Sequence, residues 1–164
     1  MSVQAVLDFA SRYAAAARAE GLADIADTLE KVPARPAETL REALQALRML
    51  HYCMWCEGDY HNTLGRFDQY MYPYYRHDID AGILTRDEAA DLICEFFLSC
   101  NRDSDLYTGM QQGDNGQSMV LAGMLPDGRD GWNELSEICL KASAELCVID
   151  PKINLRVSSK TPLE

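Results

Sequence analysis

The segment from Gly65 to Gly82, GRFDQYMYPYYRHDIDAG, limits most strongly what this chain can fold into. It combines five aromatic residues, four of them tyrosines, with three aspartates, two arginines and a histidine. A surface helix would not carry so many large rings, and an ordinary core helix would not carry the charges. The segment therefore predicts a helix that is buried on most sides and whose polar groups hold fixed positions.

Size and charge exclude several classes of protein. The chain has 164 residues, a net charge of -11 and a pI near 4.6, which argues against nucleic acid and anionic membranes as partners. No apolar run is long enough to cross a bilayer, and no basic region precedes the first apolar residues as in a signal peptide. We expect one cytoplasmic domain with reduced, buried thiols at Cys53, Cys56, Cys94, Cys100, Cys139 and Cys147.

Apolar spacing predicts a mainly α fold with a few short strands. Thr85 and Glu88 form a capping-box pattern that should begin one of the helices. The short apolar run SMVLAG and the segment INLRVS, which alternates apolar and polar residues, predict strands at 118–123 and 153–158. The helical stripes fall within Val6–Ala17, Leu22–Val32, Leu40–Cys56, Ala89–Cys100 and Leu135–Leu146.

The end of the predicted helix Leu40–Cys56 reads MLHYCMWC and is apolar almost all round. A helix that is apolar on every side is buried on every side. So small a chain cannot easily surround it, which predicts neighbours that this chain does not contain.

Four motifs in a fixed order give the chain a family resemblance. They are EALQALRMLHYCMW, LGRFDQYMYPYYRHDIDAGILTRDEAADLI, GQSMVLAGMLPDGRDGWNELSEICLKA and DPKINLRVSSKTP. Together they resemble the large domain of glycyl radical enzymes, the pyruvate formate-lyase-like family, in its branch of dehydratases, amine lyases and decarboxylases. The resemblance covers about residues 31–164. It implies that residues 1–164 form part of a ten-stranded α/β barrel, namely helical shell and first barrel strands.

The resemblance also implies a chemistry. In the family a glycyl radical near the C-terminus oxidises a cysteine to a thiyl radical, which takes hydrogen from a small organic substrate. A separate activase with an iron–sulfur cluster and S-adenosylmethionine installs the glycyl radical. The cysteine loop and the glycine motif are not in this sequence. We therefore expect an internal fragment that has no catalytic residue, binds no cofactor and is inactive alone; the parent's partners would be substrate and activase, and homo-oligomerisation is left open.

The resemblance places candidate substrate-binding residues just before GRFDQY. Many members have a histidine five residues before the glycine of this motif, whereas His61 lies only four before Gly65. The implied substrate-binding residues are His61 and its neighbour Asn62. Arg156, in the last predicted strand, would meet an anionic substrate group if that strand faces the barrel interior, or else a neighbouring carboxylate.

Three residues of the tyrosine-rich segment are predicted to be structural anchors: Arg66, Asp68 and Tyr70. A buried charge must be paired, and a buried tyrosine gives its hydroxyl to one fixed partner.

Other polar groups allow a specific and an ordinary interpretation. Cys53 and Cys56 form a CxxC pattern, but no second such pair completes a zinc site, so we expect no metal. Asp103, Asp105 and Asp114 could offer oxygen ligands to a cation, yet their spacing does not match a calcium loop, which favours a solvated loop.

His77 and Asp78 could form an acid–base pair, but the polar end of a helix is the simpler interpretation.

The alternative for the whole chain is a stand-alone helical interaction module derived from the family without its catalysis. A slice of a barrel should expose apolar faces, above all at the helix end MLHYCMWC and at the strand INLRVSS, which predicts self-association or marginal stability for the isolated chain.

Overall fold

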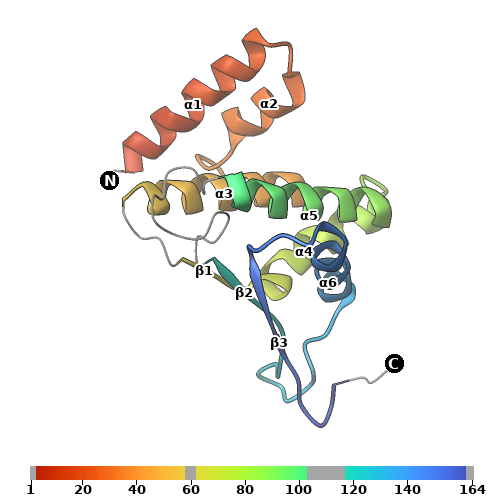
Figure 1. Ribbon diagram of the computed structural model, residues 1–164. Helices are drawn as coiled ribbons and strands as arrows, with labels where there is room; N and C mark the ends of the chain where they lie inside the picture. The colour runs from red at the N-terminus through yellow and green to blue at the C-terminus, as the bar shows by residue number, and fades with distance from the viewer. Residues whose placement is uncertain (1–2, 58–61, 103–116, 162–164) are drawn as a thin grey trace. The chain divides into compact units, whose positions relative to one another are not determined.

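The computed structural model describes residues 3–57, 62–102 and 117–161 of the chain (Figure 1). No helix in these ranges is long and apolar enough to cross a membrane. The chain divides into two compact units, Met1–Asp59 and Tyr60–Glu164. In chain order the elements are α1 (Val3–Ala19), α2 (Ala23–Lys31), α3 (Leu40–Cys56), β1 (Thr63–Arg66), α4 (Phe67–Asp80), α5 (Arg86–Asn101), β2 (Ser118–Ala122), α6 (Glu134–Leu146) and β3 (Lys152–Arg156).

The first unit consists of α1, α2 and α3. Its core is made of small and medium apolar side chains, with Ala10, Ala14, Leu29 and Met49 at its centre. Helix α3 begins with a capping box in which Thr39 accepts from the backbone of Glu42, which satisfies N–H groups of the first turn. Apolar packing and local caps are thus enough to form this unit.

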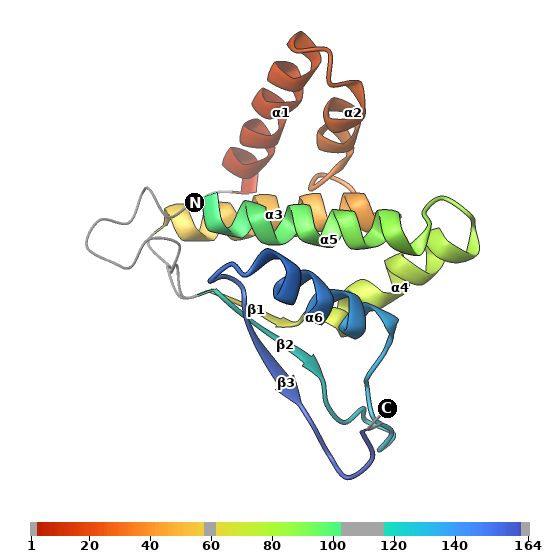
Figure 2. The same cartoon turned by 45° about the vertical axis from the view of Figure 1, so that its right-hand side comes forward.

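The second unit is built on a parallel sheet with the strand order β1-β2-β3. Met119 and Leu121 of β2 are fully buried and lie in register with Ile153 and Leu155 of β3. These residues share one face of the sheet, because alternate side chains of a strand point the same way. Helices α4, α5 and α6 lie on one side of the strands in both views (Figures 1 and 2). Within the described residues of this unit, the sheet therefore has one face against helices and one face that no helix covers, which we call the bare face.

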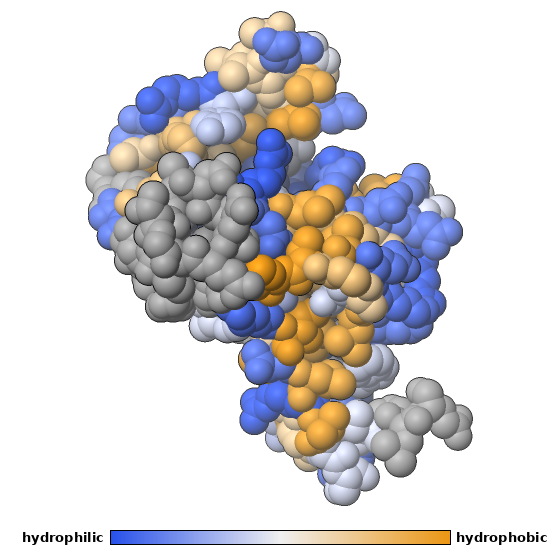
Figure 3. All heavy atoms as spheres, in the orientation of Figure 1, coloured by the Kyte–Doolittle hydropathy of each residue, from blue (hydrophilic) through white to orange (hydrophobic). Residues whose placement is uncertain are grey.

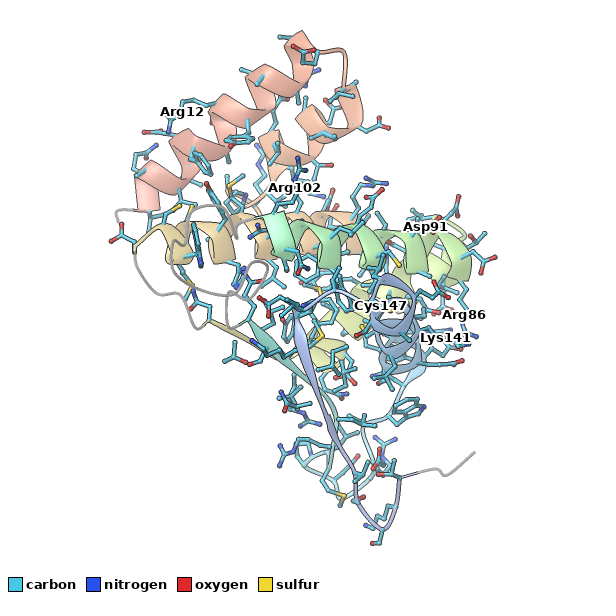
Figure 4. The ribbon with its side chains drawn as sticks, viewed as in Figure 1. Arg12, Arg86, Asp91, Arg102, Lys141 and Cys147 are labelled. Atoms are coloured by element: carbon cyan, nitrogen blue, oxygen red, sulfur yellow. The ribbon has the colours of Figure 1, made fainter. Side chains whose placement is uncertain are left out.

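Aromatic side chains fill the space between this sheet and its helices. The rings of Phe67 and Phe96 stack with their centroids 5.4 Å apart, and Tyr75 and Phe97 are fully buried. On the surface, Arg86 of α5 and Lys141 of α6 both form ion pairs with Glu137 (Figure 4). Aromatic packing in the interior and ion pairs on the surface therefore both hold the helices together.

The predicted helices and strands are present, with differences at their ends. The predicted capping box of Thr85 and Glu88 is confirmed, as are strands β2 and β3, which pair with each other in parallel. Strand β1 (Thr63–Arg66) is an addition, because the sequence predicts a helix that already contains Gly65 and Arg66.

The predicted exposure at the end of α3 is confirmed, whereas the predicted burial of all six thiols is wrong in part. Leu50 and Met54 of α3 are 45% and 49% exposed, as expected for a helix whose neighbours this chain does not contain. Of the six thiols, which are all free, those of Cys56 and Cys147 are exposed and that of Cys94 is half-buried.

The predicted exposure of apolar side chains at INLRVSS is also confirmed. Apolar side chains gather over α5 and along β3 (Figure 3), and Leu155 and Val157 are 41% and 70% exposed. Beyond β3 no further strand is paired within the described residues. An edge of this kind can accept another strand.

Candidate functional site

A buried carboxylate joins three elements of the second unit. Asp68, in the first turn of α4, is fully buried, and its Oδ2 accepts hydrogen bonds from the backbone N–H of Ala122 (2.7 Å) and the hydroxyl of Ser136 (2.5 Å). Ser136 in turn accepts from the backbone N–H of Asn133, the N-cap of α6. A carboxylate at a helix N-terminus is also favoured by the helix dipole. Asp68 thus fixes the end of β2 against α4 and α6.

Arg66, the last residue of β1, holds the end of β2 by binding the backbone carbonyls of that segment with its side chain. Its guanidinium donates to the carbonyl oxygens of Ala122 (2.9 Å), Gly123 (3.2 Å) and Met124 (3.2 Å). A planar guanidinium with five N–H donors suits several acceptors at once. Arg66 and Asp68 therefore satisfy both the donor and the acceptor of Ala122.

The backbone they hold has an unusual shape. Ala122 has a φ of 57° and Gly123 a φ of 87°, so two successive residues are left-handed. For a residue with a Cβ this conformation costs roughly 1–2 kcal/mol and persists only where its surroundings enforce it. The carbonyl of Gly123 accepts a further bond from the N–H of Gly131 (2.8 Å). We call Arg66, Asp68, Ala122, Gly123 and Ser136 the β2-end cluster.

Arg156 lies beside this cluster at the carboxyl end of β3, in register with Ala122. It alternates with Leu155, which shares the face of the buried Leu121, so Arg156 belongs to the bare face of the sheet. Arg156 is exposed, and its guanidinium makes no hydrogen bond or ion pair within the described ranges. An unpaired guanidinium on an open sheet face is suited to an anion.

Apart from Val120 and Ala122 of β2, the rest of the bare face is also polar. Thr63 donates from its hydroxyl to the carbonyl oxygen of Ser118 (3.1 Å), and Asn154 alternates with Arg156 along β3. Parallel sheets normally bury both faces and read as continuous apolar strands. The polar residues here indicate that this face meets water or a polar ligand.

The predicted substrate-binding residues are not brought together. His61 lies outside the described residues. Asn62 is buried, with 6% of its surface exposed, and precedes the amino end of β1 in line with the buried Leu64. Arg156 therefore lies at the opposite end and on the opposite face of the sheet.

Gln117 and the bend at Ala122–Gly123 were missed in the sequence. Gln117 precedes β2, is fully buried, and neither amide atom has a hydrogen-bond partner in the part of the chain that the structure describes. A polar residue directly before an apolar strand was the available signal. Nothing in the sequence near Ala122 indicates a left-handed alanine.

Tyr70, the third predicted anchor, donates its hydroxyl to the carbonyl oxygen of Leu64 (2.6 Å). Burial raises the pKa of Tyr70, and nearby acidic groups, including Asp68, add to the effect. Burial followed by the charge of Asp68 also raises the pKa of the Cys139 thiol. Burial therefore favours the neutral forms of both groups beside the cluster.

The remaining candidates lie elsewhere. Nδ1 of His77 is 2.9 Å from Oδ1 of the fully buried Asp78, at the far end of α4 from the cluster. Cys53 is buried and Cys56 exposed on α3. Within the described residues no group of three or more His, Cys, Asp or Glu side chains could hold a metal ion. Asp103, Asp105 and Asp114 lie outside the described residues.

Comparison with known proteins gives consistent matches over nearly the whole chain. A family model described as pyruvate formate lyase-like matches residues 2–164. The chain is 33% identical over 160 residues to trans-4-hydroxy-L-proline dehydratase of Clostridioides difficile, aligning 89% of this chain with 20% of that enzyme. It is 31% identical over 177 residues to isethionate sulfite-lyase of Bilophila wadsworthia, aligning 96% of this chain with 21% of that enzyme.

The fold matches as well. A crystal structure of a glycyl radical enzyme from Archaeoglobus fulgidus aligns with a TM-score of 0.87 at 28% identity, over 98% of this chain and 23% of that one. The chain thus spans about a fifth of the length of the relatives it matches.

Proposed function

Because the chain belongs to the pyruvate formate lyase-like family of glycyl radical enzymes, we propose that it forms one wall of the substrate cavity in such an enzyme. The observation that carries this proposal is the bare, polar face of its parallel sheet. A barrel strand has one face toward helices and one toward the interior, and sites in α/β folds gather at the carboxyl ends of the strands. The β2-end cluster and Arg156 lie at that end.

The open edge of β3 supports the same proposal. Leu155 and Val157 are exposed beside an edge that pairs with no strand in the described chain. In a complete barrel the next strand and its helix would cover these side chains. The helices α4, α5 and α6 would then belong to the outer shell.

Arg156 is the residue of this wall that we assign to substrate. Its guanidinium would pair with a carboxylate or sulfonate, because its planar fork of N–H donors can bind two oxygens of such a group at once. Two relatives are named for such substrates: trans-4-hydroxy-L-proline is an amino acid, and isethionate is a sulfonate. The substrate class proposed here is therefore a small organic anion or zwitterion.

His61 is proposed to contact substrate. Asn62 is buried in line with the helix-covered Leu64, so its amide is proposed to act on substrate indirectly, by orienting neighbouring groups. The radical chemistry of the family would come from a cysteine loop and a glycine loop in other parts of the enzyme. The residues described here bind, orient and exclude water.

The 164-residue chain is accordingly proposed to be inactive alone. Anaerobic incubation with an S-adenosylmethionine-dependent activase should give no glycyl radical doublet by electron paramagnetic resonance and no product from candidate substrates. A radical doublet from this chain would contradict the proposal. A monomer of high stability with a single sharp unfolding transition would instead favour a stand-alone interaction module.

A further inference from the structure

We propose that Gly123 determines anion specificity because, without a Cβ, it leaves room for the side chain of Arg156. Arg66 and Asp68 hold the backbone at Ala122 and Gly123 so that this room is kept. This inference rests on the proposed role of Arg156 in binding the anionic group of a substrate. It goes further by naming the residues that aim its guanidinium.

The contact between Gly123 and Arg156 is close enough for one methyl group to disturb it. A Cβ at position 123 would lie 3.1 Å from the Cβ of Arg156, 3.2 Å from its Cδ and 3.5 Å from its Nε. The first two distances are shorter than ordinary contacts between carbon atoms. The side chain of Arg156 would therefore have to move away from the end of β2, and its guanidinium would move with it.

Hydrogen bonds to the neighbouring backbone fix the conformation of Gly123, and with it the room for Arg156. The carbonyl of Gly123 accepts from Arg66 and from the N–H of Gly131. A Cβ on Gly131 would lie 2.7 Å from that carbonyl oxygen, so this second glycine closes the other side. With Asp68 bound to the N–H of Ala122, the bend cannot rotate to relieve a crowded Arg156.

The chain contains a matched control for this idea. Gly128 has a φ of 80°, close to the 87° of Gly123, so alanine at either position meets similar backbone strain. A Cβ at position 128 would meet only the Nζ of Lys160, at 3.6 Å. Gly123→Ala and Gly128→Ala therefore share the strain and differ in the contact with Arg156.

The test follows the Nε–Hε signal of Arg156 by NMR in the full 164-residue chain, assigned by its loss in Arg156→Lys. Methanesulfonate and acetate serve as anionic probes, and glycerol as a neutral one. We expect the anions, but not glycerol, to shift this signal. Gly123→Ala should weaken anion binding roughly tenfold, as expected for loss of one charge-assisted hydrogen bond, whereas Gly128→Ala should change it less than twofold.

The outcomes separate the two levels of the proposal. No response of Arg156 to either anion in the unaltered chain overturns its binding role, and the positioning role with it. A normal response together with equal affinities in Gly123→Ala and Gly128→Ala overturns the positioning role alone.

Loss of folding in Gly123→Ala also decides the matter. The proposal requires that Gly123→Ala/Arg156→Ala then regain a folded state, because two of the three close contacts are removed. Failure of the double variant to fold, beside a folded Gly128→Ala, would show that the crowding does not come from the Arg156 atoms beyond Cβ, which are the atoms that aim the guanidinium, and would overturn the proposal.

Discussion

The two units of the chain bury very different kinds of side chain. In the first unit, within residues 3–57, His51 is the one buried polar side chain, and charged groups such as Arg18, Asp27 and Glu30 pair on the surface. In the second unit the described residues bury Asn62, Asp68, Asp78, Gln117, Ser136 and Asp150.

This difference indicates where fixed geometry matters. A buried polar group costs free energy unless its partners are placed well, so a unit that contains many of them is specified more narrowly than one filled with alanine and leucine. The first unit could change in sequence and keep its fold. The second contains a bend that only particular residues enforce.

The largest expected effect is that of Asp68→Ala. It leaves the N–H of Ala122 and the hydroxyl of Ser136 without their acceptor, and each buried unsatisfied group costs about 1–3 kcal/mol. Asp27→Ala in the first unit removes an exposed partner of Arg18 and should have a far smaller effect, because water screens that pair. Urea unfolding followed by circular dichroism measures both.

Equal losses of unfolding free energy in these two aspartate variants would contradict the comparison. They would mean that the buried carboxylate is no more important to its unit than a surface one.

The next effect concerns acid. Burial, with a smaller contribution from the charge of Arg48, lowers the pKa of His51 from 6.5 to about 4. Below pH 6.5 the unfolded chain binds a proton that the folded chain refuses, so stability falls as the pH falls from 6.5 to 4. The loss should reach about 3 kcal/mol. Urea titrations at pH 7 and pH 4 should show a smaller difference in His51→Gln than in the unaltered chain.

The acid prediction fails if His51→Gln loses as much stability between pH 7 and pH 4 as the unaltered chain. Carboxylates elsewhere titrate in both proteins and cancel in this difference.

Self-association should depend on the second unit. Leu155→Lys/Val157→Lys places charge on the exposed edge beside β3 and should shift the chain toward monomer, because burial of one large apolar side chain is worth roughly 1.5–3 kcal/mol. Leu22→Lys/Ile25→Lys alters similarly exposed residues of the first unit and should change little. Light scattering over a range of concentrations measures self-association in both double variants. A larger decrease in Leu22→Lys/Ile25→Lys would place the self-associating surface in the first unit.

The smallest effect should be the same in both units. Thr39→Ala and Thr85→Ala each remove the side chain of a capping box, which costs about 1 kcal/mol. Thermal unfolding of both variants measures it. A difference of more than about 1 kcal/mol between them would show that one helix start does more than satisfy its own first turn.

Local signals made much of this fold predictable. Thr85 and Glu88 are only three positions apart, so their capping box could be read directly. Strand β2 is an almost uninterrupted apolar run, and β3 alternates polar and apolar residues. Strand β1 was missed because it is four residues long and contains Gly65 with a φ of 62°.

The site depended on information that no local pattern contains. Asp68 could be recognised as a buried anchor, but its partners Ala122 and Ser136 are 54 and 68 positions away. The space at Gly123 depends on Arg156, which only the register of β2 with β3 brings alongside. Residue types could be chosen from sequence, whereas their partners needed the tertiary structure.

The parallel order of the strands has a consequence for how fast the chain folds. Thr63 contacts Ser118 across 55 positions, and Asn154 contacts Met119 across 35. Closing such long loops costs entropy before any strand pairing rewards it, whereas a helical hairpin such as α1–α2 closes locally. During synthesis the first unit can therefore fold early, while β1 and β2 wait with open edges until β3 leaves the ribosome.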